Sequence, residues 1–428
     1  MKKTKDNIIP FTGYQTLLVI LLALTQFTVI LDFMIMSPLG DMLMKSMSLK
    51  PSAFGAAVSG YAISAGISAF LTAGFADKFD RKKMLLFFYT GFIAGTVLCG
   101  MAHSYPVLLA ARIITGLFGG VIGSIGFAII SDVFAVQQRG RVMAFIQMGF
   151  AASQILGIPV GLYLANNWGW EVPFFLTAGL AFIVAMVILV KVKPVTDHLK
   201  VQRDHSALTH LWRTIAKSDY RIAFAATALL SIGGFMMMPF GTAFSINNLG
   251  VTKEELVPLY IITGIVSVVV MPLIGRLSDK VNKYKIFVIA SVWTIIMCVI
   301  YTNLSITPFY LVIIINILMM AGVMSRMIPS QALMSVVPEM EDRGAFMSIT
   351  ASLQQAAGGI AAIIGGFIIY KKTDYSPLQH YDIVGYVVVG VSICSILLMG
   401  RVSRMVNRKM KDKTTVIQKD EVIISEGV

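Results

Sequence analysis

Three charged side chains inside long apolar segments are the residues of this sequence best suited to do chemistry. Asp32 lies in the first apolar segment, Arg112 early in the fourth, and Arg326 near the middle of the tenth. A charge at membrane depth costs about 2.5–3.5 kcal/mol even on the most lenient scale, so such residues usually have a function or a partner. Because a buried carboxyl group takes up a proton more readily than an exposed one, Asp32 is a candidate proton carrier. Alternatively, it is a permanently ionised partner that fixes Arg112.

The apolar segments that hold these charges are long enough to cross a membrane. Hydrophobic residues make up 57% of the 428 positions and charged residues only 13%, against about 25% charged in a typical soluble domain. Twelve apolar segments, the first near 16–38 and the last near 382–400, approach or exceed the ~18–20 residues that span a hydrocarbon core as a helix. Backbone groups in lipid must be satisfied within the segment. The sequence therefore predicts an all-α membrane protein with twelve transmembrane helices.

The sequence also contains an internal duplication. Asp77-Lys-Phe-Asp-Arg-Lys-Lys and Asp279-Lys-Val-Asn-Lys-Tyr-Lys, about 202 residues apart, each form a short charged turn between two apolar segments. Gln138-Arg-Gly and Asp342-Arg-Gly form a second pair. An even number of spans separates the copies, so the two halves should run parallel. We expect a six-helix bundle at 1–192, a polar linker at 193–220 with a short amphipathic helix near 207–215, a second six-helix bundle at 221–406, and a polar tail at 407–428.

The distribution of basic residues predicts the orientation in the membrane. With the N-terminus in the cytoplasm, only five lysines fall in external loops: Lys45, Lys50, Lys253, Lys371 and Lys372. Nearly all other Lys and Arg residues then lie on the inner side, as the positive-inside rule requires. The net charge of +13 is therefore a topology signal and favours anionic inner-leaflet lipid, and no basic soluble domain exists to bind nucleic acid.

Several other classes of function have no residues to support them. The three cysteines are isolated within apolar segments, which predicts neither disulfides nor a metal site. The three histidines of the linker, His198, His205 and His210, lack a ligand set, and a solvated linker is the expected interpretation. No phosphate-binding loop for ATP is present, and no catalytic triad or metalloprotease motif appears. We expect a protein that is not an enzyme and has no cofactor.

The sequence resembles the major facilitator superfamily over nearly its whole length, and within it the twelve-span drug:proton antiporters. The most specific motif is the turn after the second span, Ala73-Gly-Phe-Ala-Asp77-Lys78-Phe-Asp-Arg81-Lys82, which matches the family pattern except at two glycines. The second copy begins with Gly275 and continues through Asp279 and Lys280. Arg112 and the following Gly116 match the fourth span. Gly149, Gly157, Pro159 and Gly161 resemble the fifth-span exporter signature, with the proline displaced by one position.

The resemblance implies a gate at the cytoplasmic end of the bundle. Asp77 would face the start of the eleventh span, next to Arg343, and Arg81 would pair with Asp132. Such contacts join the two halves only when the inner side is closed and would therefore bias a two-state motion. A turn that only sets topology is the alternative. Small residues recur every four positions of the fifth span, at Gly149, Ser153, Gly157 and Gly161, and would allow close helix approach.

The resemblance also implies a central cavity lined by these spans. Its expected lining combines polar and adaptable apolar side chains: Gln26, Phe33, Met36, Gln154, Phe235, Met238, Phe240, Asn247, Asn316, Arg326 and Gln354. Methionine-rich surfaces repack around varied ligands, although each of these residues could equally serve in helix packing. Arg326 would bind an anionic or polar group of the substrate, or bond to backbone carbonyls and Asn316.

Together these features predict a secondary transporter of the cell (inner or plasma) membrane with both termini in the cytoplasm. The expected activity is proton-coupled antiport, by alternating access, of small and largely apolar compounds by a monomer. Its partners would be the substrate, protons and the lipid bilayer. A sugar or polar or anionic metabolite exporter of the same fold is the alternative, because two inward-facing arginines suit polar cargo. A non-transporting receptor or scaffold would have no use for repeated gating turns.

Overall fold

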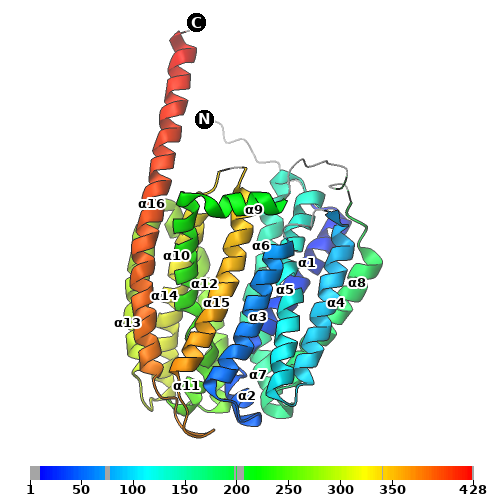
Figure 1. Ribbon diagram of the computed structural model, residues 1–428, viewed down its shortest axis with the longest axis vertical. Helices are drawn as coiled ribbons and strands as arrows, with labels where there is room; N and C mark the ends of the chain where they lie inside the picture. Colours follow the sequence, from blue (N-terminus) through cyan, green and yellow to red (C-terminus); the bar gives the residue numbers. More distant parts are fainter. Residues whose placement is uncertain (1–9, 73–77, 197–198, 200–206, 340, 427–428) are drawn as a thin grey trace.

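The structure is an upright bundle of helices with one short helix lying across its end (Figure 1). The computed structural model describes residues 10–72, 78–196, 199, 207–339 and 341–426. Within these residues twelve helices are long and apolar enough to cross a membrane, and no strand is present beyond one isolated bridge between Tyr370 and Gln379. The predicted all-α, twelve-span architecture is confirmed.

The first half supplies six spans, the fifth of them in three segments. Its helices are α1 (Gly13–Ile35), α2 (Gly40–Ser46), α3 (Pro51–Thr72), α4 (Arg81–Gly100), α5 (Tyr105–Val133), α6 (Val136–Ala152), the π-helical turn η2 (Ser153–Gly157), α7 (Ile158–Trp168) and α8 (Val172–Lys191). The short α2 extends the first span. The π-turn lies directly before Pro159, which has no N–H group to continue the α-helical hydrogen bonds.

The second half supplies the other six spans, the seventh of them broken near Pro239. Its helices are α9 (Ala207–Ala216), α10 (Ser218–Phe235), the 3₁₀ turn η4 (Met238–Phe240), α11 (Gly241–Asn247), α12 (Lys253–Lys280), α13 (Lys283–Thr302), α14 (Phe309–Met334), α15 (Arg343–Ile368) and α16 (Tyr381–Glu426). The amphipathic linker helix predicted near 207–215 is α9. The seventh span begins at Ser218, inside the segment predicted as linker, and α16 continues as one helix through the predicted polar tail.

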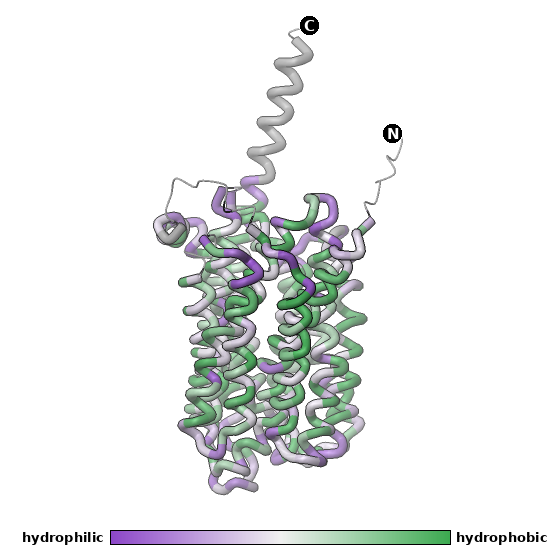
Figure 2. Tube along the Cα trace, turned by 90° about the vertical axis from the view of Figure 1, so that its right-hand side faces the viewer, coloured by the Kyte–Doolittle hydropathy of each residue, from purple (hydrophilic) through white to green (hydrophobic). Residues whose placement is uncertain are grey.

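The bundle has two polar ends and apolar flanks between them. The linker helix α9 and the last turns of α16 lie at one end, called the α9 end below, and the short helices α2 and α11 lie at the other, the α2 end (Figure 1). Figure 2 shows hydrophobic residues along the flanks between the two ends and hydrophilic residues concentrated at the ends. Many large apolar side chains on the flanks are exposed, including Phe87, Ile183 and Leu397. Such a surface is suited to lipid rather than to water.

The duplicated turns fold in the same way in both halves. Asp80 is the N-cap of α4 and accepts a hydrogen bond from the Lys82 backbone N–H at 2.8 Å. Asn282 is the N-cap of α13 and accepts one from the Tyr284 backbone N–H at 3.0 Å. An Asp or Asn N-cap satisfies backbone donors that the first helical turn leaves unpaired. The repeated phrase is therefore a repeated helix start.

The small residues of the fifth span lie against α1. A side chain at Gly149 would lie 2.8 Å from the Ala23 carbonyl oxygen, and the positions of Gly157 and Gly161 meet side chains of the same helix. Ser153 Oγ donates to the Phe27 carbonyl oxygen at 3.0 Å. Small residues let two helices approach closely, and this contact fixes the helix that carries Asp32.

The two halves meet along α3 and α15, and where α7 packs against α12. A Cβ atom at Gly55 of α3 would lie 2.5 Å from the Ala362 carbonyl oxygen of α15, and one at Gly66 would lie 2.7 Å from the Ser352 carbonyl oxygen. Only glycine fits at either position without moving the neighbouring backbone. The seam between the halves is therefore a backbone-to-backbone contact.

A bulkier residue at this seam should destabilise the packed halves. Gly55→Val is expected to lower the unfolding temperature in detergent, because overpacking typically costs about 1–3 kcal/mol. Gly390→Val in α16 is the matched control, since a Cβ there would meet nothing within 4 Å. Equal shifts for the two variants would contradict the close packing of α3 and α15.

Candidate functional site

A buried ion pair joins the first and fourth spans. Arg112 Nη1 donates to Asp32 Oδ2 at 2.7 Å, and both side chains are completely buried (0% exposed). Thr96 of α4 donates its hydroxyl to the other carboxylate oxygen at 3.2 Å. The sequence singled out both charges, and the structure brings them together. Because the two charges are opposite, the buried pair has no net charge.

The pair is only partly satisfied by hydrogen bonds. Among the described residues, Arg112 Nε and Nη2 have no hydrogen-bond acceptor. The guanidinium instead lies over the ring of Tyr61, 4.5 Å from its centroid, where the negative face of the ring attracts a cation. Removing one partner of a buried pair typically costs about 3–5 kcal/mol because an uncompensated charge remains. The pair is thus sensitive to any change in the charge of Asp32.

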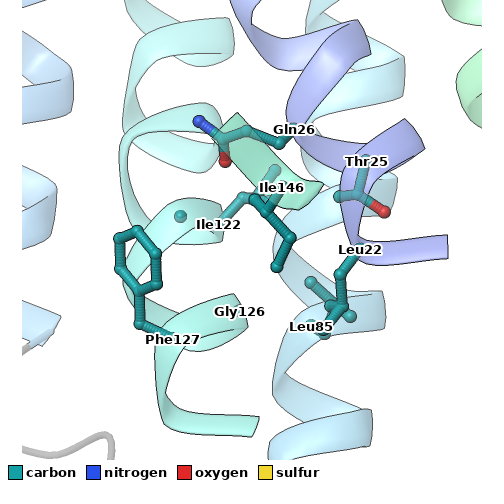
Figure 3. Close-up of a pocket in the computed structure, with 9 residues that line it drawn as sticks. Leu22, Thr25, Gln26, Leu85, Ile122, Gly126, Phe127 and Ile146 are labelled. Atoms are coloured by element: carbon teal, nitrogen blue, oxygen red, sulfur yellow. The ribbon is translucent and has the colours of Figure 1, made fainter. Parts of the chain in front are cut away.

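A small cavity lies along α1 between Asp32 and the α9 end. It holds about 10 Å³ of free space, lined by residues that include Thr25, Gln26, Ile122 and Gly126, and one water molecule needs roughly this much room. Figure 3 shows Thr25 and Gln26 on α1 beside the two α5 residues. One turn closer to Asp32, the Thr28 hydroxyl lies 2.8 Å from the Tyr89 hydroxyl of α4. Polar groups therefore continue along the seam between α1 and α4.

The predicted cavity residues fall into separate places. Phe33 packs against Phe235 of the other half, with ring centroids 5.9 Å apart. Met36 and Phe240 are fully buried in the core at the α2 end. Others are half-buried on the facing spans: Gln154 in η2, Met238 in η4, Asn316 in α14 and Gln354 in α15. Their contact with a substrate stays a prediction.

Arg326 lies inside the second half, and its side-chain hydrogen bond is not to Asn316, the partner that the sequence suggested as one possibility. Its Nη1 atom donates to Ser392 Oγ of α16 at 3.4 Å. Asn316 instead donates to the Val312 carbonyl oxygen of its own helix at 2.9 Å. Arg326 is 5% exposed, and in the described part of the chain it forms no ion pair.

The charged turn at the α9 end makes contacts within its own half. Arg81 Nε lies 3.3 Å from Asp132 Oδ2, the pairing that the family resemblance implies. Lys82 donates to the Leu189 carbonyl oxygen at 2.9 Å. Lys78 is exposed, and Asp77 lies outside the described residues. The role of this turn in joining the halves stays a prediction.

The equivalent positions of the second half differ in detail. Arg343 donates to the Ser335 carbonyl oxygen at 3.4 Å, and Arg139 makes the same contact with the Ser131 carbonyl oxygen at 2.6 Å. Gly275, Asp279 and Lys280 all lie in the last turns of α12, but the side chain of Asp279 is not among those described. These arginines tie each turn to the end of the preceding span.

The linker is anchored by the acidic residue of the second Arg-Gly turn. The Asp342 carboxylate accepts hydrogen bonds from Tyr220 (2.8 Å), from His210 of α9 (3.1 Å) and from Lys217. Burial acts to raise the pKa of Asp342, but the hydrogen bonds from these groups outweigh it and hold the pKa below its ordinary value of 3.8. His210 therefore connects α9 to the start of α15 while its side chain stays 42% exposed, a contact that the expectation of a solvated linker did not include.

The α2 end is closed by polar contacts between the halves. Asn247 of α11 donates to Asp41 of α2 at 2.6 Å, and Lys45 lies 2.7 Å from the same carboxylate. Ser48 donates to Asp374 at 3.3 Å, and Ser37 donates to the Met238 carbonyl oxygen. Between described residues, the side-chain hydrogen bonds and ion pairs that link the halves all lie at this end. Asn247 thus forms part of a closed gate.

Lys371, in the loop after α15, completes the contact. Its Nζ atom lies 3.9 Å from Asp41 Oδ1, and its side chain is 5% exposed. Burial lowers the pKa of Lys371, and the charge of Asp41 offsets this only in part. Sequence reasoning missed Asp41 and treated Lys371 only as a topology signal. Nothing in the local sequence connects Asp41 of α2 with Lys371, because the two residues are 330 positions apart.

The fold and the paired charges define a two-halved membrane transporter. The family model for the Major Facilitator Superfamily matches residues 22–362 and again 246–417. The chain therefore belongs to this superfamily, and the twelve-span duplicated bundle is its architecture.

Individual relatives are distant. Multidrug resistance protein 2 of Bacillus subtilis (strain 168) is 23% identical over 68% of this chain and 74% of its own. Among solved structures, a bacterial homologue of the human lysosomal transporter Spinster, in an inward-facing and unoccupied conformation, has a TM-score of 0.76, 14% identity, and coverage of 93% and 99% of the two chains. A D-xylose-proton symporter has a TM-score of 0.73, 15% identity, and coverage of 90% and 97%. These structures are similar in fold.

The coupling of Asp32 and Arg112 can be measured as a double-mutant cycle. Asp32→Asn and Arg112→Gln should each lower the free energy of unfolding by about 3–5 kcal/mol, since each leaves one buried charge unpaired. The double variant should lose clearly less than the two single losses combined. Denaturant unfolding in detergent would give these values. Additive losses would mean that the two charges do not stabilise each other.

The gate at the α2 end predicts the effect of removing the Asp41 charge. Asp41→Asn should open this end, because Lys45 and Lys371 would lose the carboxylate that both contact. Spin labels at Ser46 and Asn303, in a variant without the exposed Cys394, would report longer distances between the halves. Glu254→Gln, which removes an exposed carboxylate in the first turn of α12, is the control and should change little. An unchanged distance distribution in Asp41→Asn would argue against the gate.

Proposed function

We propose that this transporter is a proton-coupled antiporter that exports small, largely apolar compounds by alternating access. The observation that carries the proposal is the buried pair of Asp32 and Arg112, in which a single carboxylate neutralises a single cation. The name of the relative in Bacillus subtilis supports multidrug export. The D-xylose-proton symporter shares the fold, and a polar-metabolite exporter remains the alternative.

Protonation of Asp32 would change the charge balance of the first half. With Asp32 ionised, the pair is neutral overall. With Asp32 protonated, Arg112 keeps its charge, because a guanidinium does not release its proton in proteins. A buried uncompensated cation is costly, so the protonated protein would favour a conformation in which Arg112 reaches water or another anion. A proton could in this way shift the balance between two states.

The gate at the α2 end supplies the second part of the mechanism. With the halves held together there by Asp41, Asn247 and Lys371, access to the centre is expected from the α9 end. Basic residues concentrate at the α9 end, which supports a cytoplasmic location for it. The structure would then correspond to a state open toward the cytoplasm. Opening of the α2 end would release cargo outside.

Energy for export would come from the proton gradient without a bound cofactor. Moving one elementary charge across a membrane potential of about 100 mV yields about 2.3 kcal/mol. This is enough to concentrate a cargo several tens of fold. The pair provides a place where a single proton per cycle could act.

A reconstituted assay tests proton coupling directly. The wild-type protein in proteoliposomes should move aromatic probes with a neutral, cationic or anionic head group against their gradient when a pH gradient is imposed. Asp32→Asn should lose this driven transport, because the site can no longer exchange a proton, yet should still exchange probe across the membrane without a gradient. Internal pyranine would report the coupled proton flux.

Asp382→Asn, the same chemical change near the start of α16, is the matched control and should retain coupling. If Asp32→Asn still accumulated probe in response to the pH gradient, Asp32 would not be the proton carrier. If the wild-type protein moved no probe of any charge, the receptor or scaffold interpretation would be favoured.

A further inference from the structure

Arg326 is a buried cation that the proposed proton cycle does not use. It lies near the middle of α14 and is 5% exposed. Its guanidinium has one side-chain hydrogen bond, from Nη1 to Ser392 Oγ at 3.4 Å. Where Arg112 has a carboxylate at 2.7 Å, Arg326 has none among the described residues. The second half therefore carries an uncompensated positive charge.

Arg326 is also not a remnant of the charge pair in the first half. At the 202- and 204-residue offsets of the two duplicated turns, the counterparts of Arg112 are Ile314 and Asn316, and those of Asp32 are Gly234 and Met236. The second half therefore has no equivalent of the pair, and the first-half counterpart of Arg326, Ser124 or Ile122, is uncharged. An arginine cannot be neutralised by losing its proton, and an isolated buried charge is strongly unfavourable. Such a residue calls for an anion at some stage of the cycle.

One glycine of the seventh span, Gly233, lies beside Arg326. A Cβ atom at Gly233 would lie 3.6 Å from Arg326 Nη2, so the guanidinium packs on a position without a side chain. The next residue, Gly234, is exposed, and a Cβ there would meet nothing within 4 Å. Phe235 follows and contacts Phe33 of the first half. An open position and an aromatic side chain thus follow within two residues of Gly233, the position against which Arg326 packs.

We infer that Arg326 binds an oxyanion on the cargo, so that the exported compounds are amphipathic: an apolar or aromatic body with one carboxylate, sulfonate or phosphate group. The head group would reach the guanidinium past Gly233 and Gly234, and the body would pack on Phe235 and Phe33. Charge-assisted hydrogen bonds from arginine to such groups are short and strong. The inference rests on the proposed transport function for its meaning, but binding itself requires no proton coupling.

Binding of three probes that share a naphthyl body and carry head groups of different charge tests this. Naphthalenesulfonate is always anionic, naphthylmethanol is neutral, and naphthylmethyl-trimethylammonium is always cationic. With the purified full chain in nanodiscs of neutral lipid and no gradient, naphthalenesulfonate should bind about tenfold or more tightly than naphthylmethanol, which corresponds to ~1.4 kcal/mol. The cationic probe should bind most weakly. Probe fluorescence gives each Kd.

Variants then assign the preference to Arg326. Arg326→Gln should abolish the advantage of naphthalenesulfonate and leave naphthylmethanol unchanged, whereas Arg326→Lys should retain part of it. Arg221→Gln, which removes an exposed arginine at the start of α10, is the control for a general charge effect and should keep the full preference. Gly233→Ala adds a methyl group at ordinary contact distance from the guanidinium and should weaken naphthalenesulfonate binding more than Gly234→Ala.

Two results would overturn the inference: no preference for the anionic probe in the wild-type protein, or an unchanged preference in Arg326→Gln. If Arg326→Gln does not fold, the comparison of Arg326→Lys with the two glycine variants decides in the same way. A normal anion preference together with absent proton-driven transport would reject the proton-coupled function and leave the anion site intact. Proton-driven transport without a preference for the anionic probe would reject only the anion site.

Discussion

The neutral pairing of Asp32 with Arg112 is the constraint on which the rest of the structure depends. Burying either charge alone would be costly, and together they connect α1 to α5 through Asp32 Oδ2 and Arg112 Nη1, which lie 2.7 Å apart. The close packing of the fifth span on α1 and the hydroxyl of Thr96 hold the carboxylate in place. Because the pair balances one charge against one, a single proton is enough to unbalance it. Under the proposed function, protonation of Asp32 would in this way act on a rigid helical half.

The two halves of the chain carry different buried charges, although they come from a duplication. The same helix caps and the same arginine-to-carbonyl contacts recur in both. The first half carries the matched charge pair, while the second half carries Arg326 with no carboxylate among the described residues. Asp41 then connects the halves at the α2 end through Asn247 and Lys371. Proton binding, cargo binding and gating would accordingly occupy three separate places.

Sequence patterns were sufficient for the architecture because membrane spans and duplicated turns leave local signals. The apolar segments predicted twelve helices, and the isolated charges pointed to Asp32 and Arg112, which the structure places in contact. The gate was not predictable, since Asp41 and Lys371 meet only through tertiary folding. Asn247 stays a predicted cavity residue, and its contact with Asp41 was not predictable because an amide within a span gives no indication of its partner. His210 was assigned to solvent because its contact with Asp342 is likewise non-local.

The central claim is that Asp32 changes its protonation state while it remains inside the folded protein. Infrared spectroscopy of the protein in lipid, titrated over the pH range in which it stays folded, can detect the carbonyl band of a protonated carboxyl group. The account predicts a band that disappears as the pH rises and that is missing from the Asp32→Asn variant at every pH. A band that persists unchanged in Asp32→Asn, or a wild-type spectrum without any such band, would contradict it.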